Sequence, residues 1–268
     1  MLQGESEYYP EGRVFHGLLP SVMGSKLDLM AVGLEKEAAD EMWKGIRADC
    51  GQVEVVLNGD DPDSEAGRFN AGKMLAHSSV SDILGQAVDM CKDYLEETEG
   101  LFDPALGKMR LVDHDEEDGS LSVYGVKLQF GSFARGRALA YCAERLLQAG
   151  AGCAFVNMGN HSFLAVGSHP YGESWKVSLT NPFTRMPLEE KSLKDCAMCI
   201  SCNAPGVLGR VVDPRSGKGV EDRKMAVVTG PDPLEAKILA TAAMASSPEE
   251  AERLRAAFPG NIIEIYNL

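Results

Sequence analysis

Two stretches near the C-terminal end decide how this chain is interpreted: Asp-Pro-Arg-Ser-Gly at residues 213–217 and Ala-Lys-Ile-Leu-Ala-Thr-Ala at residues 236–242. An Asp followed by a Pro commonly builds a turn, so the first stretch is expected to be a turn. The second stretch falls in a segment, 234–245, whose pattern predicts a helix. The order in which other short motifs precede these two indicates the fold.

The size and composition of the chain are those of a globular protein. It has 268 residues, of which 44% are hydrophobic and 25% charged, enough for one large domain or two small ones. A core of this size does not need disulfides or a structural metal for stability. The net charge of -14 would repel a nucleic-acid backbone and an anionic membrane surface. We therefore expect neither nucleic acid nor a membrane as a partner, and we attribute the charge to solubility.

The seven cysteines and the N-terminal sequence predict a cytoplasmic protein. An odd number of cysteines at unpatterned spacings is typical of reduced, mostly buried thiols. The start of the chain has no basic region followed by an apolar run and no lipid-attachment cysteine, so we expect no export signal. No apolar run reaches the roughly 18 residues that a membrane helix needs.

Cys196, Cys199 and Cys202 form two overlapping Cys-x-x-Cys spacings. Such spacings occur in iron–sulfur and zinc sites, but a fourth ligand is not evident nearby. The segment also fits a strand, in which cysteines three residues apart face opposite sides. The strand is the favoured interpretation.

Strands and helices are mixed along the chain without a regular βαβ rhythm. This mixture predicts an α+β fold with a mainly antiparallel sheet flanked by helices. We expect residues 1–20 to form an N-terminal extension and residues 21–268 to form a single large domain. Helices are predicted over 34–49, 81–97, 135–148, 234–245 and 248–258, with Ser247 as N-cap of the last; strands over 21–29, 123–130, 153–157, 163–166, 175–179, 211–212, 225–228 and 262–266; a loop over 58–72; and a hairpin turn at Asp118-Gly119.

Three glycine-centred turns lie between the predicted elements, at 131–136, 157–160 and 203–206. Glycine lets a backbone approach a ligand and point N–H groups at phosphate oxygens. Turns also need glycine for their own conformation, so each turn alone is a weak signal. None fits a dinucleotide-binding G-x-G-x-x-G or a P-loop.

Six short motifs follow one another along the chain: Met-Gly-Ser at 23–25, Gly-Leu-Phe-Asp-Pro-Ala-Leu-Gly at 100–107, Phe-Gly-Ser-Phe-Ala-Arg-Gly at 130–136, Asn-Met-Gly-Asn-His at 157–161, Arg-Val-Val-Asp-Pro-Arg-Ser-Gly at 210–217, and the helical stretch at 236–242. In content and order this series resembles the motifs of the ApbE family, the FAD:protein flavin-mononucleotide (FMN) transferases. The resemblance covers roughly residues 21–268 and implies an ApbE-like, T-fold-like domain.

The resemblance also implies an activity and its ligands. Members of this family bind FAD and magnesium, cleave the pyrophosphate, and join FMN to a Ser or Thr of a target protein, which makes a flavin-accepting protein the implied partner. Magnesium suits this chemistry because it prefers carboxylates together with phosphates. Carried onto this sequence, the implied metal ligands are Ala134, through its carbonyl, and Thr241; the implied catalytic residues are Arg210, Asp213 and Lys237; and the implied FAD-binding residues are Met23, Ser25, Phe102, Asp103, Ala134, Arg135, Gly136, Asn157, Gly159, Asn160, His161 and Ser201.

Three positions depart from the family's pattern. Lys237 stands where the family has the Asp that holds magnesium, His161 where it has an acidic residue, and Arg210 where it has a His. A Lys brings three hydrogen-bond donors and no acceptor. An Arg is effectively always protonated and cannot act as a base.

These replacements allow two interpretations. In the first, Lys237 and Arg210 put fixed positive charge where the metal would lie and bind an anion or a flavin phosphate without magnesium. In the second, the site has decayed and Lys237 points to solvent. Metal-dependent transfer would need Asp213 or Asp232 to supply the missing ligand. The resulting hypotheses are an FAD:protein FMN transferase, if the site is active, or a catalytically degenerate, non-enzymatic flavin- or anion-binding protein on the same scaffold.

Overall fold

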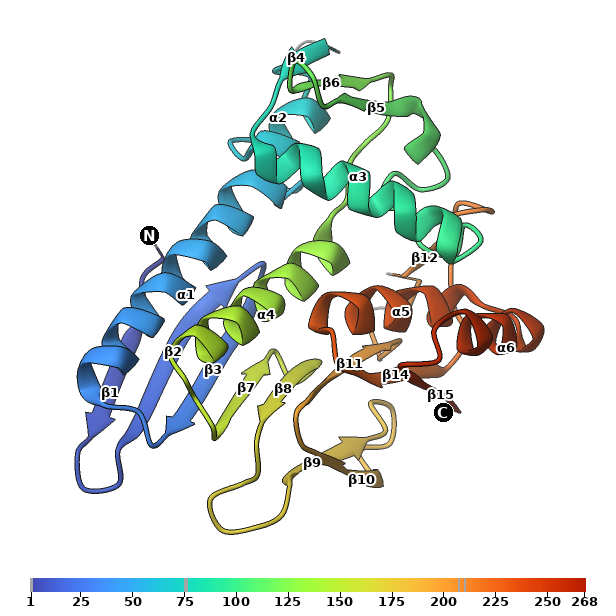
Figure 1. The fold of residues 1–268 in the computed structure, drawn as a ribbon. Helices are drawn as coiled ribbons and strands as arrows, with labels where there is room; N and C mark the ends of the chain where they lie inside the picture. The colour runs from blue at the N-terminus through green and yellow to red at the C-terminus, as the bar shows by residue number, and fades with distance from the viewer. Residues whose placement is uncertain (1, 75–76, 207, 210) are drawn as a thin grey trace.

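An eight-stranded antiparallel sheet forms the centre of the molecule (Figure 1). The computed structural model describes residues 2–74, 77–206, 208–209 and 211–268. Strands that are distant in sequence lie side by side in the sheet, because β3 pairs with β7 and β8 pairs with β11. The strand order is β1 (Glu5–Tyr9), β2 (Val14–Val22), β3 (Ser25–Val32), β7 (Ala154–Met158), β8 (Ser162–Val166), β11 (Cys196–Cys202), β14 (Lys224–Gly230) and β15 (Ile262–Asn267).

Helices cover one face of this sheet, and their apolar side chains form the larger core (Figure 1). These helices are α1 (Lys36–Leu57), α4 (Gly131–Gln148) and α5 (Pro233–Ala245), with α6 (Pro248–Ala257) following α5. Helix α5 lies between α4 and strands β11 and β14, and most of its residues are buried. A helix that is apolar on all sides belongs in a core. Lys237, a charged side chain on α5, is therefore held inside the protein.

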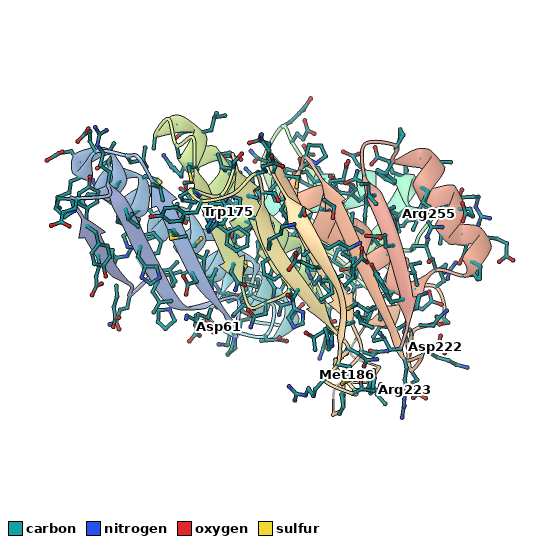
Figure 2. The ribbon with its side chains drawn as sticks, turned by 90° about the horizontal axis from the view of Figure 1, so that it is seen from below. Asp61, Trp175, Met186, Asp222, Arg223 and Arg255 are labelled. Carbon is teal, nitrogen blue, oxygen red and sulfur yellow. The ribbon has the colours of Figure 1, made fainter. Side chains whose placement is uncertain are left out.

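A two-stranded hairpin covers part of the other face of the sheet. Strands β9 (Trp175–Thr180) and β10 (Pro187–Leu193) pack Trp175, Val177 and Leu179 against β8, β11 and β14, which forms a second, smaller core. The alternation of buried and exposed residues along β9 produces this one-sided packing. Figure 2 shows Met186, in the turn of the hairpin, at the same end of the sheet as Asp222 and Arg223, and the Arg223 guanidinium lies over the Phe183 ring of this turn at 5.0 Å.

A small α/β unit lies at the end of α1, away from β9 and β10 (Figure 1). Its three-stranded sheet has the order β4 (His77–Ser79), β6 (Ser120–Val123) and β5 (Val112–Asp115), with α2 (Glu65–Asn70), α3 (Asp82–Glu97) and a 3-10 turn at Met109–Leu111. A further short pair, β12 (Val212–Asp213) and β13 (Lys218–Gly219), flanks the Asp-Pro-Arg-Ser-Gly turn. No helix of the described residues is both long enough and apolar enough to cross a bilayer.

The predicted α+β class with an antiparallel sheet is confirmed. Helix 81–97 matches α3 closely, and Ser247 caps α6 in a capping box with Glu250, as the sequence predicted. The hairpin turn at Asp118-Gly119 joins β5 to β6. Residues 5–20, part of the predicted extension, form β1 and most of β2 in the sheet. Helix 34–49 extends to Leu57, and the predicted loop 58–72 contains α2.

The predicted strand over 123–130 is wrong. Val126, Leu128 and Phe130 are buried alternately, which is why the segment has the pattern of a strand. Its backbone, however, bonds to other partners: the Leu128 amide donates to Asn70 Oδ1 at 2.7 Å and the Gln129 amide donates to the Pro104 carbonyl at 2.7 Å. The segment is a buried connection that leads into α4, which begins at Gly131 rather than 135.

The cysteine-rich segment is strand β11, as favoured from the sequence. Cys199 faces the larger core beneath α5, whereas Cys196 and Cys202 pack against the smaller core. Among the described residues, no group of three or more His, Cys, Asp or Glu side chains is placed to hold a metal ion. The three cysteines therefore have the alternating orientation of a strand.

Candidate functional site

Two hairpin turns lie next to each other at the same end of the strands of the sheet. The β2–β3 turn and the β7–β8 turn are neighbours because Leu27 pairs with Met158 across β3 and β7. A Cβ atom at Gly159 would lie 3.0 Å from Ser25 Oγ, and Gly159 has a positive φ of 65°. Glycine is therefore required here for both its conformation and its close approach to Ser25. The structure thus brings two predicted FAD-binding residues into contact.

The first turn of α4 is tied to the β2–β3 turn. Arg135 Nε donates a hydrogen bond to the Met23 carbonyl at 3.3 Å. Met23 itself has a left-handed backbone with φ of 48°, and its amide donates to Glu54 Oε2 at 2.5 Å. A non-glycine residue holds such a conformation only where its surroundings impose it. Helices α1 and α4 thus fix Met23 in the turn between β2 and β3.

Lys237 is buried, with 5% of its surface exposed, and it points toward β11. Its Nζ donates to the Ile200 carbonyl at 2.8 Å. The Ile200 amide donates to the His161 carbonyl at 2.7 Å, so the Ile200 carbonyl lies on the side of the same turn, where the His161 amide donates to the Met158 carbonyl at 3.2 Å. Lys237 Nζ is therefore the hydrogen-bond donor to the Ile200 carbonyl, at the point where β8 begins beside β11. The interpretation in which Lys237 points to solvent is wrong, because α5 has no solvent-facing side at this position.

The electrostatic setting of Lys237 is unusual for an ammonium group. Burial lowers the pKa of Lys237 below its ordinary value of 10.5; the Cys199 thiol opposes this effect and the charge of Arg135 adds to it. Among the described residues, no carboxylate accepts a hydrogen bond from Lys237 Nζ. A buried cation beside a second cation is stabilised by an anion.

Three hydroxyl groups gather one helical turn from Lys237. Thr241 Oγ1 lies 3.0 Å from Ser132 Oγ and 3.4 Å from Ser201 Oγ, and it also donates to the Lys237 carbonyl at 3.1 Å. These hydroxyls come from α5, from the first turn of α4 and from β11. The sequence had singled out Thr241 and Ser201 but had not assigned a role to Ser132.

The residues at this place do not fit magnesium. Thr241 and the Ala134 carbonyl are the only two predicted ligands, and Lys237 is a donor rather than an acceptor. Asp232 accepts from the Leu234 and Glu235 amides as the N-cap of α5, at 2.7 and 3.1 Å. Asp213 accepts from Arg215 and Ser216. Both carboxylates that could replace the missing ligand are therefore engaged in other hydrogen bonds.

The loop after α3 is organised around two buried side chains. Asp103 accepts from the Ala105 amide at 2.6 Å and from the Met109 amide at 3.2 Å. Phe102 is buried, and its amide donates to Thr98 Oγ1 at 3.1 Å. These contacts give Phe102 and Asp103 a clear part in shaping the loop, and any direct contact with FAD remains a prediction.

The Asp-Pro-Arg-Ser-Gly turn connects that loop to the end of α5. A Cβ atom at Gly107 would lie 2.4 Å from the Pro214 carbonyl, so the turn rests directly on the loop. Arg215 donates to Asp213 Oδ1 at 3.0 Å, to the Ala245 carbonyl at 3.1 Å and to Glu250. Burial opposes the charge of Asp213, but the hydrogen bonds of Arg215 and Ser216 outweigh it and lower the pKa of Asp213. Asp213 is thus held ionised beside a fixed cation.

Glu250→Gln is expected to flatten the acid side of the stability profile. The Ser247 amide lowers the pKa of Glu250 below its ordinary 4.5, burial opposes this effect, and Arg215 lowers the pKa further. A carboxyl with a lowered folded pKa stabilises the protein above its unfolded pKa, and this stabilisation is lost as the pH falls through the folded value. Below pH 4.5, urea unfolding should show that the wild type loses more stability than the variant. Parallel profiles would contradict this linkage.

A hollow of about 610 Å³ lies on the other face of the sheet, under β9. Asn157, Asn160 and His161 line it at the β7–β8 turn, where the Asn157 and Asn160 side chains are joined by a hydrogen bond of 2.9 Å. Lys176 and Arg185 line it from the hairpin, and the sequence analysis had missed both. No motif marks them, because the hairpin crosses this face only in the folded chain.

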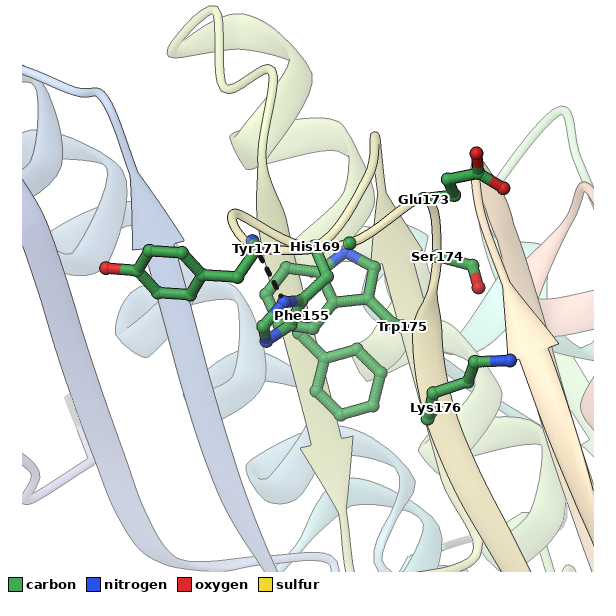
Figure 3. A pocket seen from close by; sticks show the side chains of 8 residues that line it. Phe155, His169, Tyr171, Glu173, Ser174, Trp175 and Lys176 are labelled. Carbon is green, nitrogen blue, oxygen red and sulfur yellow. Dashed lines mark hydrogen bonds between the residues drawn. The ribbon is translucent and has the colours of Figure 1, made fainter.

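A neighbouring hollow of about 520 Å³ is shown in Figure 3. Phe155 and Trp175 stack with ring centroids 5.0 Å apart, and His169 meets the edge of Trp175 at 4.8 Å. Trp175 is buried, as its strand pattern predicted. None of the predicted FAD-binding residues lines this hollow, so we do not assign it to the site. Arg210, a predicted catalytic residue, lies outside the described residues.

Comparison with known proteins identifies the family. The model of the ApbE family matches residues 108–264, more than half of the chain. This protein therefore belongs to the ApbE family. The matched span contains the α4, β7–β8, Asp213 and α5 motifs, whereas the motifs at 23–25 and 100–107 precede it. No protein of curated function matches the chain in sequence.

Solved ApbE structures share the fold. The flavin transferase ApbE from Vibrio cholerae has 17% identity and a TM-score of 0.79, with 97% of this chain and 93% of that chain covered. The flavinyl transferase ApbE from Pseudomonas stutzeri, in its apo form, has 22% identity and a TM-score of 0.74, with 95% and 89% covered. The ApbE protein from Thermotoga maritima has 17% identity and a TM-score of 0.78, with 99% and 97% covered. At these identities the likeness shows a common fold.

Proposed function

We propose that this protein binds FAD where the β2–β3 turn, the β7–β8 turn, α4 and α5 meet, and that it transfers FMN to a Ser or Thr of a target protein. One observation carries the proposal: the motifs of the family, far apart in sequence, meet in pairs. Ser25 meets Gly159, Ser132 meets Thr241, and Gly107 meets Pro214. Chance matches to short motifs would not be expected to converge in this way.

In this proposal the pyrophosphate of FAD lies at the hydroxyl cluster of Ser132, Ser201 and Thr241. The first turn of α4 begins beside these hydroxyls without a side-chain cap, so its amides and the helix dipole also favour an anion. The hollow under β9 is large enough for one ring system of the dinucleotide, since small-molecule pockets measure about 300–1,000 Å³. Asn157, Asn160 and His161 supply polar groups on its wall.

The transfer exchanges the phosphoanhydride bond of FAD for a phosphoester bond on the acceptor. The acceptor hydroxyl oxygen bonds to the phosphorus of the FMN half, the bond from that phosphorus to the bridging oxygen breaks, and AMP leaves. The hydroxyl proton must pass to a base. We propose Asp213 as that base, because it is ionised and partly exposed beside its hydrogen-bond partners Arg215 and Ser216. Charge that develops on the phosphate oxygens is stabilised by fixed donors and cations.

A second candidate is a non-catalytic flavin- or anion-binding protein. The replacement of a metal-binding Asp by the buried Lys237 favours it, because the site then holds an anion without the ion that the family's chemistry uses. Where the second candidate binds FAD, the two candidates differ only in the fate of the pyrophosphate.

The test separates binding from transfer. FAD binding is measured by calorimetry and by quenching of flavin fluorescence, and AMP release is measured chromatographically with and without peptides that carry Ser or Thr acceptors. Binding together with peptide-dependent AMP release and FMN on the peptide supports the transferase. Binding without AMP release supports the non-catalytic candidate. Protein that binds no FAD at all rules out the transferase and leaves the second candidate only as a protein that binds another anion.

An Asp213→Asn variant tests the proposed base. It keeps the Oδ1 acceptor for Arg215 and places an amide donor opposite Ser216 Oγ, but it cannot take a proton near neutral pH. Transfer should fall by about 100-fold or more while FAD affinity changes little, since general-base catalysis contributes about 10²–10⁴-fold. Equal transfer by both proteins would show that Asp213 serves only the turn.

A further inference from the structure

The position that holds a metal-binding Asp in the family holds a buried ammonium group in this chain. Lys237 Nζ reaches the Ile200 carbonyl at 2.8 Å, and its helix places Thr241 one turn further on. Thr241 is retained, whereas both nearby Asp residues serve other hydrogen bonds. The departure is therefore more than the loss of a ligand, because it introduces a charge of the same sign as the ion.

The surroundings of Lys237 favour an anion. The charge of Arg135 acts on Lys237 across the site, and Cys199 and Cys202 are the acidic groups that offset it, as thiols of raised pKa owing to burial. Neutral thiols do not balance the charge of the Lys237 ammonium, and Lys237 Nζ donates to a backbone carbonyl rather than to a carboxylate among the described residues. The chain as a whole is strongly acidic, so the buried Lys237 ammonium is opposite in sign to its general composition.

We propose that Lys237 supplies the positive charge that a divalent ion would otherwise supply, so that the site binds the pyrophosphate of a nucleotide without a metal. The inference rests on the proposed function for the identity of the nucleotide, FAD. The Lys237 ammonium and the Arg135 guanidinium face the phosphate oxygens, and the hydroxyls of Ser132, Ser201 and Thr241 donate to them.

A structural role is the alternative that the experiment must separate. Lys237 satisfies the Ile200 carbonyl, so its loss would also weaken the fold. Lys224 offers a matched control, because it is a buried lysine whose Nζ donates to the Ser246 carbonyl at 2.8 Å and the Met244 carbonyl at 3.3 Å, at the far end of α5. Lys224→Met removes the same kind of contact away from the site.

The experiment measures FAD affinity in EDTA and in magnesium for four proteins. Wild-type affinity should agree within about twofold between the two buffers. Lys237→Met should weaken binding by at least about thirtyfold in both buffers, since removal of a buried charge partner has an effect of this size. Lys237→Asp should bind poorly in EDTA and recover by about tenfold or more in magnesium. Lys224→Met should bind as the wild type does.

Two results would overturn the proposal. One is wild-type binding that requires magnesium. The other is a Lys237→Met protein that binds FAD normally while its unfolding midpoint drops, which would make Lys237 a structural group only. Circular dichroism checks that each variant is folded, and calorimetry with magnesium alone should detect an ion on Lys237→Asp and none on the wild type.

A failure of the proposed function is recognised separately. If the wild type binds FAD in neither buffer, inorganic pyrophosphate is used as the probe. Pyrophosphate in EDTA should then stabilise the wild type and Lys224→Met against heat, but not Lys237→Met. This result would uphold the proposal that Lys237 replaces the metal ion, although FAD is not the ligand. If pyrophosphate does not stabilise the wild type, the proposal that Lys237 replaces the metal ion is overturned as well.

Discussion

Replacing Gly107 by Ala is expected to destabilise the protein by about 2–4 kcal/mol and to displace the Asp-Pro-Arg-Ser-Gly turn. Gly107 has a positive φ of 84°, and a Cβ atom there would lie 2.4 Å from the Pro214 carbonyl. The strained backbone accounts for about 1–2 kcal/mol and the steric overlap for the remainder. Urea unfolding measures the total.

Gly119→Ala is the matched control for this change. Gly119 has a similar positive φ of 67°, but a Cβ atom there would meet nothing within 4 Å. It should show the backbone strain alone, about 1–2 kcal/mol. If the two variants lose equal stability, the contact between Gly107 and Pro214 has no energetic importance. If the turn also positions Asp213, Gly107→Ala alone should impair FMN transfer.

The elements that the sequence predicted well are those whose own residues determine them. Helix α3 has a clear apolar stripe and a Ser81 cap, and α6 has its capping box, so both were located closely. Strand β11 was favoured because its local pattern fits a strand, in which cysteines three residues apart face opposite sides. The convergence of the motifs also follows from their order once the family resemblance is recognised.

The elements that the sequence missed depend on distant partners. Strand β10 is mostly exposed and charged, so its periodicity is weak, and it is a strand because it pairs with β9. Segment 123–130 has the alternation of a strand but bonds to Asn70 and Pro104. Local pattern could not distinguish these cases, because in each the backbone partner is remote in sequence.

The orientation of Lys237 was not predictable from the helix that carries it. Helix α5 is apolar on all sides, so the 3.6-residue period gives it no polar face toward which a lysine would be directed. Lys237 Nζ bonds to the Ile200 carbonyl of β11, and the His161 amide of the neighbouring β7–β8 turn donates to the Met158 carbonyl. This arrangement depends on strands that are remote from α5 in sequence. Two interpretations were therefore left open by the sequence, and the folded chain excludes the solvent-facing one.

The spacing between α4 and α5 determines where Lys237 lies, which leads to the second large effect. A Cβ atom at Gly136 would lie 3.0 Å from Lys237 Cβ and 3.1 Å from Leu234 Cα. These obstacles are close to or part of the α5 backbone, so they cannot move aside by a simple side-chain rotation. Gly136→Val should therefore separate the helices and cost about 2–3 kcal/mol, despite the better helix propensity of Val.

Gly45→Val in α1 is the control for a valine placed in a helix. The obstacle there is Arg145 Nε at 2.9 Å, the far end of a flexible side chain, so we expect a loss of about 1 kcal/mol or less. Urea unfolding compares the two variants, and FAD titration in EDTA then reports the site. Gly136→Val should bind FAD more weakly even where it is fully folded, because the separation of the helices moves Lys237 away from Ser132 and Arg135. Normal binding by folded Gly136→Val would show that the site tolerates this displacement and that close packing of α4 on α5 serves stability alone.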